Sequence, residues 1–177
     1  LLSQIDSKTI KLIDDDLDDR NAKYNVEQAV LKLQSMQLYS GGLSYWEGSN
    51  YVSQHGSIYA LHFLSEAKEK GYNVSDDVMN KLRIYVKNMI NRSKMRKYSY
   101  WENNGYSYRT HIDRNAVYGA YVLAKINKPD KAILNYLRSK KELLSVDSKF
   151  MLAMSYKLIG DDKNYKSLLP DYTNPTK

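Results

Sequence analysis

Apolar residues recur along most of this chain at the spacing of one face of an α-helix. Val26, Val30, Leu33 and Met36 fall at i, i+4, i+7 and i+10, which is the first clear stripe of this kind. No segment alternates apolar and polar residues clearly enough to predict a strand, and the polar, basic stretch 91–97 is interpreted as a loop. The sequence therefore predicts an all-α fold of about six to eight helices joined by short loops.

Glycines and capping residues set the expected ends of these helices. Gly71 suits the position just after a helix, and Ser75 suits the position just before the next one. Pro129 is placed in the first turn of a later helix, where a proline is tolerated. The predicted helices cover 26 to about 39, 53–70, 75 to about 90, 113–127, 129–139, 146–159 and 162–169.

One unit of the sequence occurs twice. Tyr45-Trp46-Glu47 and the helix after it recur as Tyr100-Trp101-Glu102 and its following helix, in the same order. A unit of this length is two helices plus connections, and such units stack as an open solenoid or close into a ring. The aromatic loop before each inner helix favours the ring, an α/α toroid. In that arrangement Trp46 and Trp101 are expected to pack as wedges between helix pairs, with stacking on a ligand as the alternative.

Composition excludes several functions. A chain of 177 residues suits a single domain, 1–177, and the absence of cysteine excludes disulfides, thiolate metal sites and a cysteine nucleophile within it. The net charge of +7 would suit nucleic acid, but Lys and Arg are scattered and cluster tightly only at 92–97. A basic solvated surface is therefore favoured, and no nucleic-acid partner is predicted. No apolar run reaches the roughly 20 residues that span a bilayer.

Tyrosine is unusually frequent, with 17 Tyr against 2 Phe and 2 Trp. Tyrosine suits half-buried positions where the ring packs and the hydroxyl finds water or a polar partner. The excess therefore indicates a wet concave surface or an interface with another molecule. The opening residues 1–6 lack the basic start and long apolar stretch of a signal peptide, so we expect the chain to begin within a longer polypeptide.

Four sequence segments resemble the α2-macroglobulin family, in the order that the family has them. VEQAV (26–30), LQSMQ (33–37) and GGLSYW (41–46) resemble its helix, LQ-x-x-Q and GG-F-x-YW pattern. The segment 59–74 resembles the family's AYxLxFLxxAxxxGYxV, and 121–130 and 152–161 resemble the next two helix pairs. The resemblance covers roughly residues 25–165. It implies a fragment of the α/α-toroid, thioester-type domain of a bacterial α2-macroglobulin-like protein.

That resemblance implies a large cell-envelope protein, periplasmic or lipid-anchored, that inhibits proteases by trapping them. In the family, cleavage of a bait segment triggers a rearrangement, and an internal Cys–Gln thioester is exposed to nucleophiles on the captured protease. This chain lacks the cysteine, so the thioester lies upstream of Leu1 or is absent from this member. The implied partners are proteases and neighbouring domains of the same polypeptide. An incomplete ring would also expose an apolar seam that favours self-association.

The sequence leaves two other functions open. A toroid enzyme of the terpenoid-cyclase or prenyltransferase type would use Asp14–Asp19 to hold Mg²⁺ and diphosphate, but a solvated charged segment is the favoured interpretation. A non-catalytic module could instead present a Tyr-rich, basic concave surface to a glycan or protein. No Gly-x-Ser-x-Gly elbow is present, and no catalytic residue, cofactor or metal is predicted.

The histidines and the aromatic loops supply the candidate site residues. His55 and His111 fall in comparable places after each Trp and are expected to have structural roles, whereas His62 lies within an apolar stripe as a core histidine. We expect the functional or packing surface at one end of the toroid. Its members are Tyr45, Trp46, His55, Tyr100, Trp101 and His111.

Overall fold

The structure, a computed structural model, describes residues 17–92 and 94–169. This part of the chain forms seven α-helices, one short 3₁₀ helix and one two-stranded antiparallel sheet. The helices are α2 (Leu17–Ser35), α3 (Gln54–Glu69), α4 (Asp76–Arg92), α5 (Arg114–Lys125), α6 (Lys131–Ser139), η2 (Lys141–Leu143), α7 (Val146–Leu158) and α8 (Asp162–Leu168). The strands are β1 (Met95–Glu102) and β2 (Gly105–Ile112).

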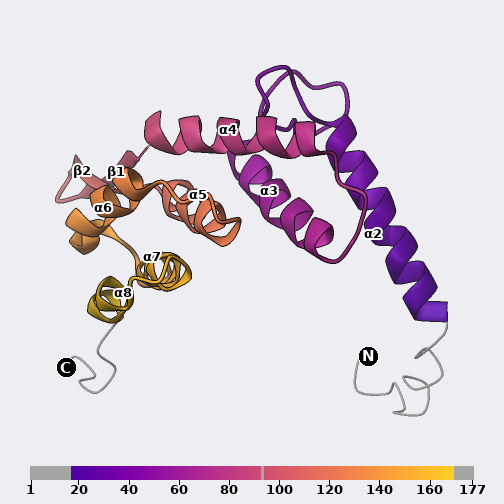
Figure 1. Ribbon diagram of the computed structural model, residues 1–177. Helices are drawn as coiled ribbons and strands as arrows, with labels where there is room; N and C mark the ends of the chain where they lie inside the picture. Colours follow the sequence, from indigo (N-terminus) through magenta and orange to yellow (C-terminus); the bar gives the residue numbers. More distant parts are fainter. Residues whose placement is uncertain (1–16, 93, 170–177) are drawn as a thin grey trace, which may run out of the picture.

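The helices form an arc of two layers (Figure 1). Helices α3, α5 and α7 line the inner side of the arc, and α2, α4, α6 and α8 lie on its outer side. Helix α5 packs against α3, α4 and α7, so it ties the middle of the arc together. In the described residues the two ends of the arc, α2 and α8, lie apart.

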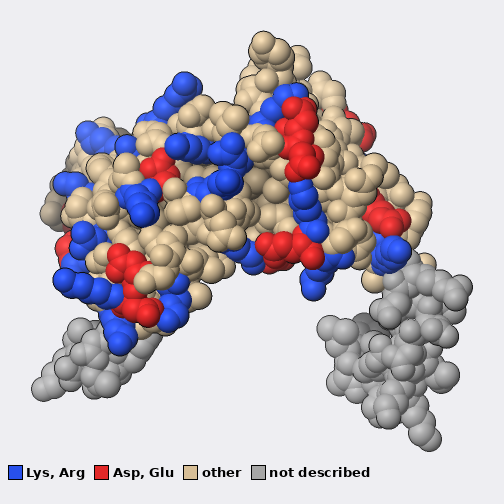
Figure 2. Space-filling model, viewed as in Figure 1, with Lys and Arg blue, Asp and Glu red and all other residues tan. Residues whose placement is uncertain are grey.

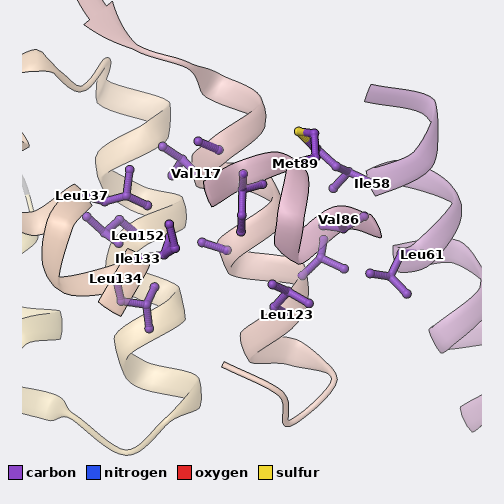
Figure 3. Close-up of a cluster of buried hydrophobic side chains, with 14 of the residues drawn as sticks. Ile58, Leu61, Val86, Met89, Val117, Leu123, Ile133, Leu134, Leu137 and Leu152 are labelled. Atoms are coloured by element: carbon purple, nitrogen blue, oxygen red, sulfur yellow. The ribbon is translucent and has the colours of Figure 1, made fainter. Parts of the chain in front are cut away.

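One continuous apolar core joins the two layers. Figure 3 shows Ile58 of α3 and Val86 of α4 lying close together on one side of α5, and Val117 of α5 lying on the other side near Leu137 of α6 and Leu152 of α7; all five belong to one buried cluster. These side chains are almost completely buried. Of the apolar stripe described from the sequence, Val30 is buried in this core, and Val26, Leu33 and Met36 are partly buried against it.

Several predicted helix ends are confirmed by their hydrogen bonds. Helix α3 begins after Ser53, whose hydroxyl accepts from the Gly56 N–H. It ends in a Schellman motif, because the Tyr72 N–H donates to Ala67 O at 3.0 Å and the Gly71 N–H donates to Lys68 O at 3.0 Å. Gly71 has φ +86°, a conformation that glycine adopts without steric cost.

Three helix boundaries were predicted wrongly. Helix α2 begins at Leu17 rather than Val26 and ends at Ser35 rather than near Tyr39, so a stretch that includes the exposed residues 21–25 precedes the apolar stripe. Helix α6 begins at Lys131, and Pro129 therefore lies before the helix instead of in its first turn. Asp130 caps that helix by accepting from the backbone N–H groups of Ala132 and Ile133. The helix therefore starts after this carboxylate, which occupies the N-cap position, and not at the proline.

The all-α prediction is wrong for residues 95–112, which form the β1–β2 hairpin. Glu102 pairs with Gly105 across a two-residue turn. Both turn residues, Asn103 and Asn104, have positive φ, at 50° and 58°, as a type I′ turn requires. Aromatic residues lie on both faces of the hairpin, so the apolar–polar alternation that identifies a half-buried strand is missing. The segment 91–97 is likewise not all loop, because β1 begins at Met95.

Candidate functional site

Five of the six predicted site residues lie in two separate places, and the sixth, His55, lies in α3. Tyr45 and Trp46 belong to the connection between α2 and α3, which is fixed to the first half of α4 because the Gln37 side chain donates to Val78 O at 2.9 Å. Tyr100, Trp101 and His111 belong to the hairpin that follows the far end of α4. Figure 1 shows the connection and the hairpin at opposite ends of that helix. The structure therefore does not gather the six predicted residues at one end of the fold.

Neither tryptophan packs as a wedge between helix pairs. Trp46 is 70% exposed and touches Tyr45, with ring centroids 4.8 Å apart in an edge-to-face arrangement. Trp101 is 63% exposed and touches Tyr106 in the same manner at 5.0 Å. The wedge-packing prediction is wrong, because the loop and hairpin project these rings into solvent. Large exposed aromatic rings are typical of interaction surfaces.

The two histidines predicted to be equivalent occupy different structures. His55 lies in the first turn of α3, where its Nδ1 is 3.2 Å from Oδ1 of Asn115 on α5. His111 lies in β2, with its ring against Tyr98 at 5.1 Å and its Nδ1 buried without a hydrogen-bond partner. Their equivalence in the repeat breaks down because the second unit places a hairpin where the first places a loop.

A polar network that sequence reasoning missed joins α3 to α5. Nδ1 of His62 is 3.0 Å from the Tyr118 hydroxyl. Nε2 of the same ring is 3.4 Å from Oε1 of Glu66, an ion-pair distance without hydrogen-bond geometry. Lys125 closes the network by donating to Oε1 of Glu66 at 2.5 Å. His62 was interpreted as a core histidine, but it is only half-buried, and its i+4 spacing to Glu66 was the available signal.

His62 is expected to make stability depend on pH. Burial lowers the pKa of His62 below its ordinary value of 6.5, and nearby Lys125 lowers it further, against the opposing effect of Glu66. Between the lowered folded-state pKa and the unfolded value the folded state binds fewer protons, so the free energy of unfolding falls as pH falls through this window. The pKa of Glu66 is itself lowered from its ordinary value of 4.5, chiefly by its hydrogen bond to Lys125, so Glu66 is a carboxylate near the neutral end of this window.

Urea unfolding between about pH 5 and pH 7.5 measures this dependence. The wild-type chain should lose stability toward the acidic end, and His62→Gln should show a flatter profile across the same range. An equally steep profile in the variant would assign the dependence to another group.

The hairpin presents cations beside aromatic rings. Nζ of Lys97 lies 4.4 Å from the ring centroid of Tyr108, and the Arg109 guanidinium lies 4.7 Å from that of Tyr100. Arg109 Nε also donates to the Tyr100 hydroxyl at 3.1 Å. These contacts hold two long cationic side chains in place on an exposed surface. The hairpin is therefore a candidate interaction site, in addition to the connection that carries Tyr45 and Trp46.

The described residues supply no evident metal site. Among them, no group of three or more His, Cys, Asp or Glu side chains is placed to hold a metal ion. The acidic run proposed for Mg²⁺ lies outside this test, because Asp14–Asp16 and the side chains of Asp18 and Asp19 are outside the described residues. No described helix is long and apolar enough to cross a membrane.

The sequence comparison and the structure comparison both find alpha-2-macroglobulins. No family model matches the chain. An alpha-2-macroglobulin from Rickettsia conorii is 27% identical over 157 residues, which is 88% of this chain and 8% of that protein. The chain therefore spans only a small part of the relative that it matches.

The similar solved structures are also alpha-2-macroglobulins. Native Escherichia coli alpha-2-macroglobulin, from domain MG7 to the C-terminus, has a TM-score of 0.71 at 19% identity, covering 97% of this chain and 28% of that one. The trypsin-activated Escherichia coli protein has a TM-score of 0.69 at 19% identity, covering 85% of this chain and 10% of that one. A Salmonella alpha-2-macroglobulin mutant gives 0.70 at 18% identity, with 94% of this chain and 11% of that one covered. The sequence match and the shared fold together make this chain a homologue of part of the bacterial alpha-2-macroglobulins.

Proposed function

We propose that this chain is a non-catalytic segment of a bacterial alpha-2-macroglobulin-like protease inhibitor. The sequence match to the Rickettsia conorii protein, extending over 88% of the chain, carries the proposal. The parent protein would trap proteases rather than hydrolyse a substrate of its own. The similar structures include Escherichia coli proteins activated by trypsin and by porcine elastase, which makes serine proteases of this kind the first partners to test.

Within that protein, we assign the chain to the thioester-type helical domain, as an incomplete α/α toroid. Two features support this assignment. Inner helices α3, α5 and α7 alternate along the chain with outer helices α2, α4, α6 and α8, which is the order in which a ring of helix pairs is built. The fold also matches the region from MG7 to the C-terminus of the Escherichia coli protein. Residues outside this chain would then close the ring and cover its free ends.

The chain itself would act as scaffold for the trapping reaction. It has no cysteine, so it contains no Cys–Gln thioester, and covalent capture would need a cysteine elsewhere in the parent protein. Its own contribution is a rigid arc held by one core, on which neighbouring domains could pack. A cell-envelope location, periplasmic or lipid-anchored, goes with this proposal and rests on the family resemblance alone.

The test uses the full-length parent protein and trypsin. A trap hides the captured protease from large substrates while small ones still diffuse in. After mixing, trypsin should therefore keep its activity on a small chromogenic amide and lose most of its activity on a protein substrate. Full activity on the protein substrate would contradict the inhibitor proposal.

Methylamine separates covalent from non-covalent trapping. If the parent carries a thioester, methylamine should release one thiol and add the matching mass, as the amine attacks the acyl carbon and the thiolate leaves. The 177-residue chain is the control and should release no thiol, because it has no cysteine. A parent that traps trypsin but does not react with methylamine would be an inhibitor without a thioester.

A further inference from the structure

The β1–β2 hairpin has an open edge. The sheet to which it belongs contains only these two strands within residues 17–92 and 94–169. Strand β2 packs beside η2, whereas residues 95–99 and Trp101 of β1 are exposed. The outer edge of β1 therefore exposes backbone N–H and C=O groups that a further strand could pair with.

The register identifies which backbone groups point outward. The pair that flanks a two-residue turn, here Glu102 and Gly105, is a hydrogen-bonded pair, and hydrogen-bonded and non-hydrogen-bonded pairs then alternate. Counting back along β1, the N–H and C=O groups of Trp101, Ser99 and Lys97 point away from β2. Three consecutive sites of this kind can hold an extended peptide of about six residues.

The same three residues lie on the more exposed face of the hairpin. Cross-strand partners share a face, so Trp101 faces outward with Tyr106, and Ser99 with Tyr108. Tyr106 and Tyr108 are 70% and 61% exposed. Trp101 and Tyr106 meet edge to face at an interplanar angle of 85°, so they do not form the flat shared platform on which sugar rings stack.

Charge indicates what kind of peptide the edge accepts. The segment 94–112 carries four cationic side chains and one carboxylate: Lys94, Arg96, Lys97 and Arg109 against Glu102. Arg96 is paired with Asp113, but within the described residues neither Lys97 nor Arg109 has a carboxylate partner. Figure 2 shows Lys and Arg prominent over α4 and the end of the molecule where the hairpin lies.

We propose that the outer edge of β1 binds an extended acidic peptide segment of a partner protein as a third strand. Backbone hydrogen bonds to Lys97, Ser99 and Trp101 would hold the segment in place. The unpaired cations would select acidic side chains, and the exposed rings would cover the aliphatic parts of the segment. The same cations disfavour edge-to-edge pairing with a second copy of this chain, because like charges would then face each other. This inference goes beyond the proposed inhibitor role and does not depend on it.

Binding is tested with the 177-residue chain and a pair of fluorescein-labelled peptides of about eight residues, matched to the length of β1. One peptide alternates Asp with Val, and the other alternates Lys with Val. Fluorescence anisotropy should show the Asp peptide binding at least about tenfold more tightly, with affinity falling as salt rises. Equal affinity for the two peptides would overturn the charge argument, and no binding of either would overturn the site.

Two matched pairs of variants test whether the peptide binds at the outer edge of β1. Ser99→Pro removes an outward N–H from β1, and Thr110→Pro should remove an outward N–H from the β2 edge. Lys97→Glu and Lys166→Glu change the net charge equally, on the hairpin and on α8. We expect Ser99→Pro and Lys97→Glu each to weaken binding by about tenfold or more, and their partners to leave it unchanged. Equal losses within either pair would contradict the assigned edge.

Hydrogen exchange gives an answer even if Ser99→Pro disturbs the hairpin. In the unsubstituted chain, the outward amides of Lys97, Ser99 and Trp101 should exchange fast and slow down when the Asp peptide is added. The amide of Thr110 should keep its rate, because it points toward the other edge. Protection at Thr110 without protection at Ser99 would overturn the proposal.

Discussion

Replacing Gly119 by valine is expected to destabilise the folded chain by about 3 kcal/mol, the upper part of the usual range for overpacking a core. Gly119 lies on α5 where α3, α4 and α5 meet. A Cβ at this position would lie 2.7 Å from Cγ2 of Ile90, 3.3 Å from Cγ1 of Val86 and 3.7 Å from Cδ1 of Ile58. The first distance is far inside van der Waals contact, and Cγ2 of Ile90 is a branch methyl that a change of χ2 does not move. The helices would have to separate, opening the core on either side.

The measurement is urea unfolding of the variant beside two controls. Asn80→Val places the same β-branched residue at an exposed position of α4 and should cost no more than about 0.7 kcal/mol, the helix-propensity term alone. Gly119→Ala should fall between the two, because alanine favours a helix over glycine by about 1 kcal/mol while still meeting Ile90. A valine variant as stable as the Asn80→Val control would show that α4 and α5 are not packed as closely as described.

The close approach at Gly119 was not predictable from the sequence, whereas the helices around it were. Helices α3 to α8 could be predicted because the apolar stripe and the capping residues of each helix lie within one continuous segment of the chain. Ser53, for example, caps α3 through a bond to Gly56 only three residues away. Within a helical sequence pattern, Gly119 indicates only a position of low helix propensity. Its role in packing becomes clear only once its neighbours on α3 and α4 are known. Contacts between distant segments are the part that a single sequence leaves open.

The hairpin was missed for a different reason. Its turn signal, Asn103-Asn104-Gly105, was present, but the strands carry Tyr and Trp on both faces and so lack a period of two in hydrophobicity. The sequence repeat also led to a wrong prediction. It equated Tyr100-Trp101-Glu102 with the loop residues Tyr45-Trp46-Glu47, and so it implied a loop where β1 in fact pairs with β2. The repeat also led to wedge packing, although a ring's exposure depends on what surrounds it in the fold. Trp46 and Trp101 were expected to be packed between helix pairs, but both rings are exposed.

Asp113 is the residue through which the hairpin is attached to the helical arc. It is 4% exposed and sits at the junction between β2 and α5. Its Oδ1 accepts from the Asn115 N–H at 2.9 Å and caps α5, and its Oδ2 accepts from Nε of Arg96 on β1 at 2.6 Å. Its own N–H donates to Lys94 O at 3.0 Å, which fixes the start of the hairpin. One carboxylate thus joins the capped helix to the strand that we propose as the peptide edge.

Asp113→Ala is therefore expected to cost about 2 kcal/mol, from the lost helix cap and the partly buried Asn115 N–H left without its acceptor. The contribution of Arg96 is smaller, because its side chain is 56% exposed and water can replace the carboxylate. Asp113→Asn keeps the capping oxygen and removes the charge, so urea unfolding should place it about midway. Arg96→Gln removes only the ion pair and should cost less than Asp113→Ala. If Arg96→Gln proved as costly as Asp113→Ala, the ion pair rather than the cap would dominate, and the hairpin would be held to the arc by charge.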